Sequence, residues 1–144
     1  MGKKRIAKKG GGAVDGGEKA RALSKIPKKK MEKAVLNVKA TYNNILLTLC
    51  DEKGNTIAWT SSGALGFKGA KKGTPFAAAK AGELMGDKAK MIGIKEVDIV
   101  VKGIGAGRES AMRAFISKGF KLRTIKDSTP IPYNGPRLPK ARRV

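Results

Sequence analysis

Lysines and glycines occur together in residues 61–73, a combination suited to binding phosphate groups. Lys68, Lys71 and Lys72 can neutralise phosphate charge, and the small residues around them let a phosphate approach backbone N–H groups. Phe67, in the same stretch, could stack on a base or a ribose. We interpret this stretch as a nucleic-acid contact. The alternative is a solvated loop whose phenylalanine lies in the core.

A second stretch has glycine at alternate positions, Gly103, Gly105 and Gly107, followed by Arg108. At the start of a helix this arrangement resembles a phosphate cradle, because a helix N-terminus favours an anion and arginine binds phosphate bidentately. It lacks the spacing of a dinucleotide fingerprint and the Gly-Lys-Ser/Thr of a P-loop. A tight turn that binds nothing explains the same residues, and both interpretations stand at this point.

The C-terminal stretch combines four prolines with the basic residues Arg137, Lys140, Arg142 and Arg143. Proline limits the conformational freedom that is lost on docking, so we expect these cations to contact phosphates along a fixed path. A disordered basic tail is the alternative. The pair Asn134-Gly135 also supports the hypothesis of conversion to isoaspartate, which isoaspartate-sensitive cleavage and peptide mass spectrometry would detect.

Groups that could catalyse a reaction are scarce. The chain has no histidine and one cysteine, Cys50, so a serine or cysteine nucleophile has no histidine base and no intramolecular disulfide can form. Asp51 and Asp98 are the only strand acids with a prospect of holding a nuclease metal, and no third acid accompanies them. We therefore expect no catalysis, no metal and no cofactor.

The charge of the chain predicts a polyanionic partner. Lysine and arginine number 32 against 11 acidic residues, which gives a formal net charge of +21 and a pI of about 10.4. Nucleic acid is the usual partner of so basic a chain. No apolar run is long enough to cross a bilayer and no signal-peptide pattern is present, so we expect a cytoplasmic protein that binds no membrane.

The charge and composition also predict three regions. Residues 1–33 form a basic Gly/Lys-rich extension with few apolar side chains, which we expect to order only on a partner; a solubilising tail is the alternative. Residues 34–127 form an α/β domain, and residues 128–144 form a Pro/Arg-rich tail.

The domain should contain five strands and two helices in the order β-β-β-α-β-α-β, which predicts a mixed five-stranded sheet. Apolar alternation predicts a strand near residues 34–41, and the run at 45–51 predicts a strand buried on both faces. Thr74-Pro75 should start a helix that Gly93 ends. The remaining elements are expected at residues 56–60, 96–102, 109–118 and 120–126.

Right-handed crossovers should place both helices on one face of the sheet. Gly82 and Gly86 in the first helix then suggest a close backbone approach to the sheet. Trp59 should lie in the core or at the sheet edge. The helix-free face should be polar and basic, and open to RNA or the tails; it should carry Asn37, Lys39, Thr41, Thr48, Lys102, Lys121 and Arg123.

Several segments resemble those of the small-subunit ribosomal protein eleven family, of bacterial type. They occur in order between about Glu32 and Val144 and comprise ATYNN (40–44), GFKG (66–69), TPFAA (74–78), VKG (101–103), GRESA (107–111), TPIP (129–132) and the basic ending PKARRV (139–144). Ile104 and Ala106 stand where that family usually has proline, so the glycine loop is expected to be less rigid here.

The resemblance implies a ribonuclease-H-like α/β fold without nuclease activity. It also implies a structural constituent of the small (30S) ribosomal subunit that binds the 16S rRNA central domain and builds the platform near the mRNA exit and the Shine-Dalgarno helix. The implied neighbours are ribosomal proteins seven, eighteen and, in many bacteria, twenty-one. The alternatives are a basic RNA-processing nuclease and a DNA-compacting protein.

The residues and the resemblance together give one predicted set of RNA-binding residues. Its members are Lys39, Asn43, Asn44, Ser61, Ser62, Gly63, Phe67, Lys68, Gly69, Lys71, Lys72, Thr74, Gly103, Gly105, Gly107, Arg108, Thr129, Asn134, Gly135, Arg137, Lys140, Arg142 and Arg143.

Overall fold

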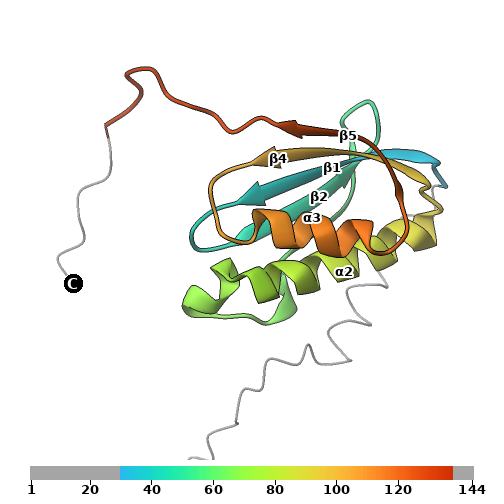
Figure 1. Ribbon diagram of the computed structural model, residues 1–144, viewed down its shortest axis with the longest axis horizontal. Helices are drawn as coiled ribbons and strands as arrows, with labels where there is room; N and C mark the ends of the chain where they lie inside the picture. Colours follow the sequence, from blue (N-terminus) through green and yellow to red (C-terminus); the bar gives the residue numbers. More distant parts are fainter. Residues whose placement is uncertain (1–29, 138–144) are drawn as a thin grey trace, which may run out of the picture.

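A five-stranded mixed sheet carries two α-helices on one of its faces (Figure 1). The computed structural model describes residues 30–137, so most of the predicted N-terminal extension and the predicted contacts Lys140, Arg142 and Arg143 lie outside the described residues. The elements run in the order β1 Lys33–Ala40, β2 Ile45–Cys50, β3 Thr56–Ser61, η1 Gly63–Leu65, η2 Gly69–Gly73, α2 Pro75–Ile92, β4 Glu96–Lys102, α3 Arg108–Ile116 and β5 Lys121–Asp127.

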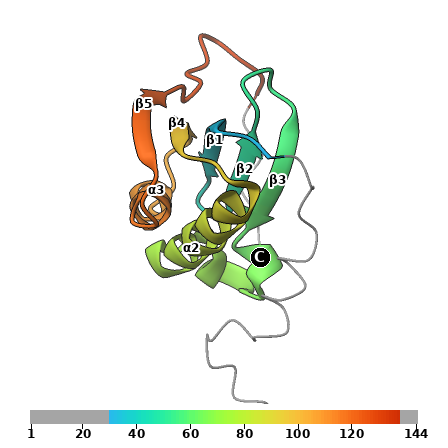
Figure 2. The same cartoon turned by 90° about the vertical axis from the view of Figure 1, so that its right-hand side faces the viewer.

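The sheet has the strand order β3-β2-β1-β4-β5, which confirms the predicted mixed five-stranded sheet. β1, β2 and β3 form an antiparallel meander, whereas β4 pairs in parallel with both β1 and β5. Parallel pairing requires crossovers, and here α2 and α3 supply them on the same face, as Figure 2 shows. No helix among residues 30–137 is long and apolar enough to span a membrane.

The core lies between this helix-covered face and the helices. Leu36 and Val38 of β1 alternate with more exposed neighbours, and Ile99 of β4 lies beside them; all three are almost fully buried. On the helix side, Leu84 and Met85 of α2 close the same cluster. The alternation predicted for the first and fourth strands therefore sets which side chains point to the helices.

The prediction that the second strand is buried on both faces was wrong. Ile45, Leu47 and Leu49 point into the core, but Leu46 is 36% exposed on the helix-free face. The apolar run suggested a strand covered on both sides. Within the described residues the helices cover the sheet on one side only, so the two-residue period of the strand leaves Leu46 exposed and Thr48 partly exposed on the other face, while Cys50 at the end of the strand is buried.

Helix α2 begins and ends as the sequence predicts. The Thr74 hydroxyl accepts a hydrogen bond from the Ala77 N–H at 3.4 Å, and Pro75 occupies the first turn, where its missing N–H costs nothing. Gly93 ends the helix in a left-handed conformation with φ of 91°. Capping chemistry at both ends thus fixes the helix boundaries from local sequence.

The prediction that Gly82 and Gly86 bring α2 close to the sheet was wrong, because the close neighbour is α3. A Cβ atom at Gly82 would lie 2.5 Å from the carbonyl oxygen of Ala111, and one at Gly86 would lie 2.6 Å from the Cγ of Lys118. The two helices lie side by side on one face, so the smallest residues are needed where the helices meet rather than where α2 faces the strands.

Candidate nucleic-acid interface

Two segments meet at one end of the sheet and form what we call the loop surface, defined as residues 41–44, residues 61–74 and Phe76. The hydroxyl of Ser62 donates a hydrogen bond to the side-chain oxygen of Asn44 at 2.6 Å and accepts one from the Ile45 N–H at 3.3 Å. Ser62 is fully buried. Asn44 and Ser62, both predicted to bind RNA, therefore hold the β1–β2 turn against η1.

A second contact joins the same two segments. A Cβ atom at Gly73 would lie 2.2 Å from the carbonyl oxygen of Tyr42, so only glycine lets η2 lie this close to the β1–β2 turn. A Cβ atom at Gly63 would lie 3.5 Å from the Cδ of Lys72. The stretch predicted as a loop is thus two short 3₁₀ turns held at fixed positions.

The lysines of the loop surface carry charge that no acidic side chain of residues 30–137 offsets. Lys68, Lys71 and Lys72 form no ion pair within the described residues. The sequence has no acidic residue between Glu52 and Glu83. Lys68 and Lys71 are exposed and Lys72 is half-buried. Such cations remain available to replace the counterions of a nucleic-acid backbone.

The exposed aromatic rings of the loop surface are not the ring that the sequence indicated. Phe67 is partly buried against the core and meets Phe76 edge to face, with 6.0 Å between ring centroids. Tyr42 is 74% exposed and Phe76 is 55% exposed. Neither ring was among the predicted RNA-binding residues. Tyr42 lies at the tip of the turn between two predicted strands, and a side chain at such a position is usually exposed.

The glycines of the 103–107 loop are explained by packing. A Cβ atom at Gly103, where φ is 98°, would lie 2.0 Å from the Ala40 carbonyl oxygen, and one at Gly105 would lie 2.4 Å from that of Thr41. The Gly103 N–H donates to the Thr129 hydroxyl, and the Gly105 N–H donates to the Ala40 carbonyl. These N–H groups have partners inside the protein, so the tight-turn interpretation accounts for the loop without a ligand.

Arg108 likewise has partners within the chain. Its guanidinium donates to the Gly103 carbonyl at 2.8 Å and to the carboxylate of Asp127. The hydroxyl and the N–H of Thr129 donate to the same carboxylate at 2.6 and 3.0 Å. The hydrogen bond from the Thr129 side chain, followed by that from Arg108, lowers the pKa of Asp127 to about 2. Arg108 and Thr129 thus tie the end of β5 to the glycine loop.

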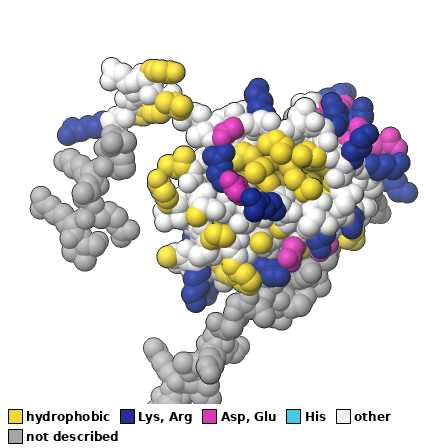
Figure 3. Space-filling view, in the orientation of Figure 1, with side chains coloured by type: hydrophobic (Ala, Val, Ile, Leu, Met, Phe, Trp, Pro, Cys, Tyr) yellow, Lys and Arg dark blue, Asp and Glu magenta, His cyan; other side chains and the backbone are white. Residues whose placement is uncertain are grey.

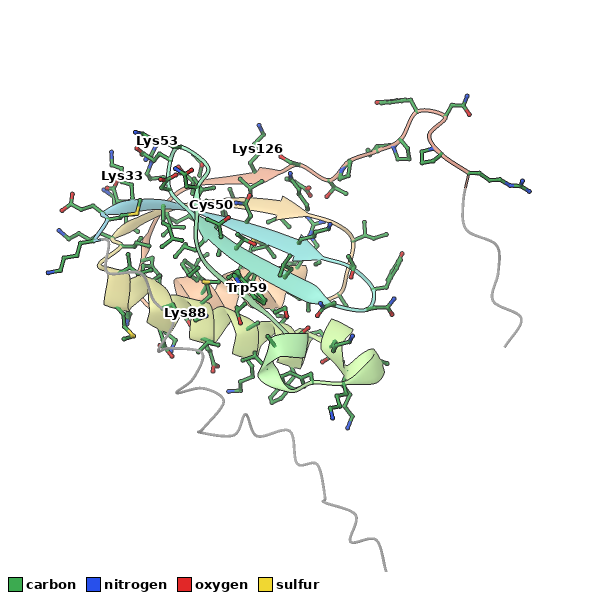
Figure 4. The ribbon with its side chains drawn as sticks, turned by 180° about the vertical axis from the view of Figure 1, so that it is seen from behind. Lys33, Cys50, Lys53, Trp59, Lys88 and Lys126 are labelled. Atoms are coloured by element: carbon green, nitrogen blue, oxygen red, sulfur yellow. The ribbon has the colours of Figure 1, made fainter. Side chains whose placement is uncertain are left out.

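The helix-free face of the sheet is mixed, not uniformly polar and basic as predicted. Lys39 and Lys102 border a hollow of ≈ 240 Å³ whose lining includes Leu46. Lys121 is paired with Glu96 on this sheet. Trp59 was predicted to lie in the core or at the sheet edge. It lies on the edge strand β3 (Figure 4), and 58% of it is exposed. Lys33 and Lys126 lie on the helix-free face by strand register, so this face offers several lysines without ion pairs in the described residues beside apolar side chains.

The remaining predicted contacts are spread around the loop surface and the tail. Asn43 and Gly69 are exposed, and the buried hydroxyl of Ser61 accepts the Ala64 N–H. The tail leaves the sheet after Ser128, whose N–H donates to the Val101 carbonyl, and then runs away from the body (Figure 1). Its described part is exposed and contains Asn134, Gly135 and Arg137.

The two carboxylates with a prospect of metal binding serve other purposes. Asp51 is buried and accepts hydrogen bonds from the N–H groups of Lys53 and Asn55, which closes the β2–β3 turn. Asp98 accepts a hydrogen bond from Thr124. Within residues 30–137 no three His, Cys, Asp or Glu side chains come together as a metal site.

A basic α/β body that presents unpaired lysines and exposed rings at one end defines a class: a protein that binds a polyanion. The sequence model of the family described as Ribosomal protein S11 matches residues 34–143. Small ribosomal subunit protein uS11 of Solibacter usitatus (strain Ellin6076) is 48% identical over 126 residues, which cover 88% of this chain and 93% of that protein.

The chain belongs to the ribosomal protein S11 family and is of the bacterial type. It is therefore a structural constituent of the small ribosomal subunit and not an enzyme, and its partners are ribosomal RNA and other ribosomal proteins. The predicted family and the predicted lack of catalysis are confirmed, and the nuclease alternative is excluded.

Proposed function

We propose that the loop surface binds the central domain of 16S rRNA and helps to build the platform of the small subunit, near the mRNA exit and the Shine-Dalgarno helix. The observation that carries this proposal is the cluster of Lys68, Lys71 and Lys72, unpaired within the described residues and adjacent to the exposed rings of Tyr42 and Phe76. Cations supply affinity for phosphate, and aromatic rings stack on unpaired bases.

The rigidity of this surface supports the same proposal. The hydrogen bond from Ser62 to Asn44 and the close approach of Gly73 to Tyr42 fix the two segments before RNA arrives. Preorganised groups lose less conformational entropy on binding. The RNA is then recognised chiefly by the shape of its backbone, because most of the available contacts are to phosphate and ribose.

The basic extensions enlarge the contact in this proposal. Residues 1–33 and 128–144 flank the proposed α/β domain of residues 34–127 in the sequence, and the described part of the tail is exposed from Pro130 to Arg137. Lys140, Arg142 and Arg143, which lie outside the described residues, add three further cations to the sequence of the tail. Their contribution would appear as a steeper dependence of affinity on salt concentration.

The finer assignments are part of the proposal. The strand order β3-β2-β1-β4-β5 and the two helices on one face support a ribonuclease-H-like sheet. The protein works on cytoplasmic ribosomes, beside ribosomal proteins seven and eighteen and, where present, twenty-one. Crosslinking within assembled subunits would test these neighbours, and an experimental structure superposed on that sheet class would test the fold.

Binding of the full-length chain to a 16S central-domain fragment tests the proposed function. The triple variant Lys68→Gln, Lys71→Gln, Lys72→Gln should reduce the slope of log affinity against log salt by about 2, since each phosphate contact contributes roughly 0.7 with single-stranded nucleic acid. The control triple Lys53→Gln, Lys90→Gln, Lys126→Gln removes the same charge from exposed lysines elsewhere.

The control should retain most of the slope. Equal losses in the two triples would contradict a localised interface. Equal affinity of the unsubstituted chain for duplex DNA at the same salt concentration would instead favour the DNA-compacting alternative.

A further inference from the structure

An apolar surface lies on the side of the molecule where β5 borders α3. We call it the β5 surface and define it as Met112, Ile116, Leu122 and Ile125. Leu122 is 36% exposed and Ile125 is 56% exposed, and all seven residues of β5 are exposed. Figure 3 shows hydrophobic side chains gathered on this side of the molecule.

The pairing of β5 explains why Leu122 and Ile125 share a face. Leu122 pairs with Val97 and Ile125 pairs with Ile99, both of which point into the core, so their β5 partners lie on the helix-covered face. The close approaches of the helices to the sheet are those of α3 to β1 and of α2 to β2 and β3. The helices therefore cover the centre of this face and leave its β5 edge open.

Helix α3 contributes the other half of the surface. Its Ala111 and Ala114 lie against Gly82 of α2. Met112 and Ile116 are one turn apart and, at about 100° per residue, lie on the side of α3 that faces away from α2. Both are partly buried against the core, so they form the floor between α3 and β5.

Most charges around the β5 surface are paired; the exception within β5 is Lys126, which lies opposite Val100 on the helix-free face and forms no ion pair within the described residues. Every basic residue from Arg108 to Arg123 forms an ion pair inside the chain. The acidic partners, in order along those basic residues, are Asp127, Glu109, Asp87, Glu96 and Glu52. Exposed pairs of this kind stabilise a fold little, but they leave few free cations for phosphate. An apolar centre with a polar, charge-balanced rim matches a protein interface.

The backbone of β5 is also available. β5 is an edge strand and pairs only with β4 among the described strands. At the opposite edge, the Trp59 carbonyl of β3 accepts a hydrogen bond from the Lys88 ammonium at 3.0 Å, and half of β3 is buried. A long exposed edge strand is a template for a further strand.

From these observations we propose that the β5 surface docks an extended, apolar and weakly charged segment of another small-subunit protein, which pairs with β5 as a sixth strand. The proposal rests on the ribosomal role and adds to it the surface and the chemistry of the partner. Four apolar side chains and one strand edge make a small interface, so it should form within the assembled subunit and be weak between free proteins.

Photo-crosslinking in reconstituted subunits tests this proposal. Subunits are assembled from 16S rRNA, purified small-subunit proteins and the full-length chain with a photoreactive amino acid in place of Ile125. The control carries it in place of Met91, an α2 residue that is 63% exposed and outside both surfaces. The substitution at Ile125 should crosslink to an extended apolar segment of one identified small-subunit protein, and the substitution at Met91 should not.

Crosslinks from position 125 only to rRNA, to residues 1–29 of the same chain or to a second copy of it would overturn the proposal, as would no crosslink at all. Failure of the unsubstituted chain to enter subunits would refute the ribosomal role and the docking with it. Normal entry without a protein crosslink would refute the docking alone.

Hydrogen exchange and competition give a second readout. The β5 amides that point away from β4 should be protected in the subunit and not in the free chain, because a sixth strand bonds them; the amides that already bond to β4 are protected in both. Ile125→Asp should lower incorporation against the unsubstituted chain about tenfold, as expected for a charge placed in an interface core, and leave binding to the isolated rRNA fragment unchanged. Met91→Asp, with the same charge change, should incorporate normally; equal losses would count against the proposal.

Discussion

The loop surface and the β5 surface are both exposed, yet they differ in what surrounds their charges. Lys68 and Lys71 of the loop surface have no acidic partner among the described residues, and two rings of the same surface, Tyr42 and Phe76, are exposed. Around the β5 surface each basic side chain from Arg108 to Arg123 has an acidic partner, and Lys126, on the helix-free face of β5, is the one cation of that strand without an ion pair among the described residues. A net charge of +21 therefore does not spread RNA affinity evenly.

The two surfaces differ in whether their cations are paired with carboxylates, not in how many cations they carry. A lysine already bonded to a carboxylate offers little to a phosphate, whereas an unpaired lysine releases counterions when RNA binds. One chain can thus present one surface to RNA and another to protein.

The glycine loop belongs to the fold rather than to the RNA contact, and Gly103→Ala tests this. The new Cβ would meet the Ala40 carbonyl at a residue with φ of 98°, so the free energy of unfolding should fall by roughly 2–4 kcal/mol. Gly54→Ala is the matched control, because φ there is 89° but nothing lies within 4 Å; it should cost about 1 kcal/mol. Chemical denaturation measures both. A normal stability with lost RNA affinity would restore the phosphate-cradle interpretation.

Ser62→Ala should loosen the loop surface. It leaves the Ile45 N–H and the Asn44 side chain without a buried partner, which should cost roughly 1–3 kcal/mol of unfolding free energy. Affinity for the 16S fragment should fall as well, because the lysines lose their fixed positions. Ser117→Ala removes an exposed hydroxyl and serves as the control. Undiminished RNA affinity in a destabilised Ser62→Ala protein would show that rigidity is irrelevant to binding.

Lys88 is a buried cation that belongs to neither surface, and its contribution to the free energy of unfolding should depend on pH. Burial lowers the pKa of Lys88 below 10.5 in the folded chain, so the folded state binds fewer protons than the unfolded state between the two pKa values. Stability should therefore rise with pH across that window. Lys88→Met should abolish this rise and be neutral or stabilising near pH 7. Denaturation curves between pH 7 and about 10.5 measure this pH dependence of the unfolding free energy. Lys90→Met, at an exposed lysine, is the control. A rise in stability that is the same in Lys88→Met as in the unsubstituted chain would contradict the role of Lys88.

The Arg108–Asp127 pair at the rim of the β5 surface should be the subtlest probe. The pKa of Asp127 is lowered to about 2, first by the Thr129 side chain and then by Arg108. Because this pKa is lowered, the ionised Asp127 carboxylate stabilises the folded state. That stabilisation is fully present above the ordinary pKa of 3.8 and is lost as pH falls through about 2. NMR titration should show that Thr129→Val raises this pKa more than Arg108→Gln does. The reverse order would mean that the ion pair dominates.

Local patterns in the sequence predicted the parts of the fold that depend on neighbours along the chain. Thr74-Pro75 and Gly93 bound α2 because caps act within one turn. The alternation of Leu36 and Val38 identified the core face of β1. The same reasoning failed for Leu46, because whether a sheet has one or two covered faces is a property of the whole fold.

The candidate site was predictable in its charge but not in its details. The absence of acids between Glu52 and Glu83 excludes an ion pair of the loop lysines within their own segment. Pairs such as Lys121 with Glu96 depend on strand register across 25 residues, so no local pattern reveals them. The exposure of Tyr42 and Phe76, and the use of the Gly103 and Gly105 N–H groups within the fold, likewise require the tertiary structure.

Lysine-modification footprinting of the full-length chain, free and bound to the 16S central-domain fragment with no other protein present, tests the central claim most directly. The account predicts that RNA protects Lys68 and Lys71 from acetylation, whereas Lys118 and Lys121 react as they do in the free chain. Protection of Lys118 and Lys121 with Lys68 and Lys71 still reactive would contradict it.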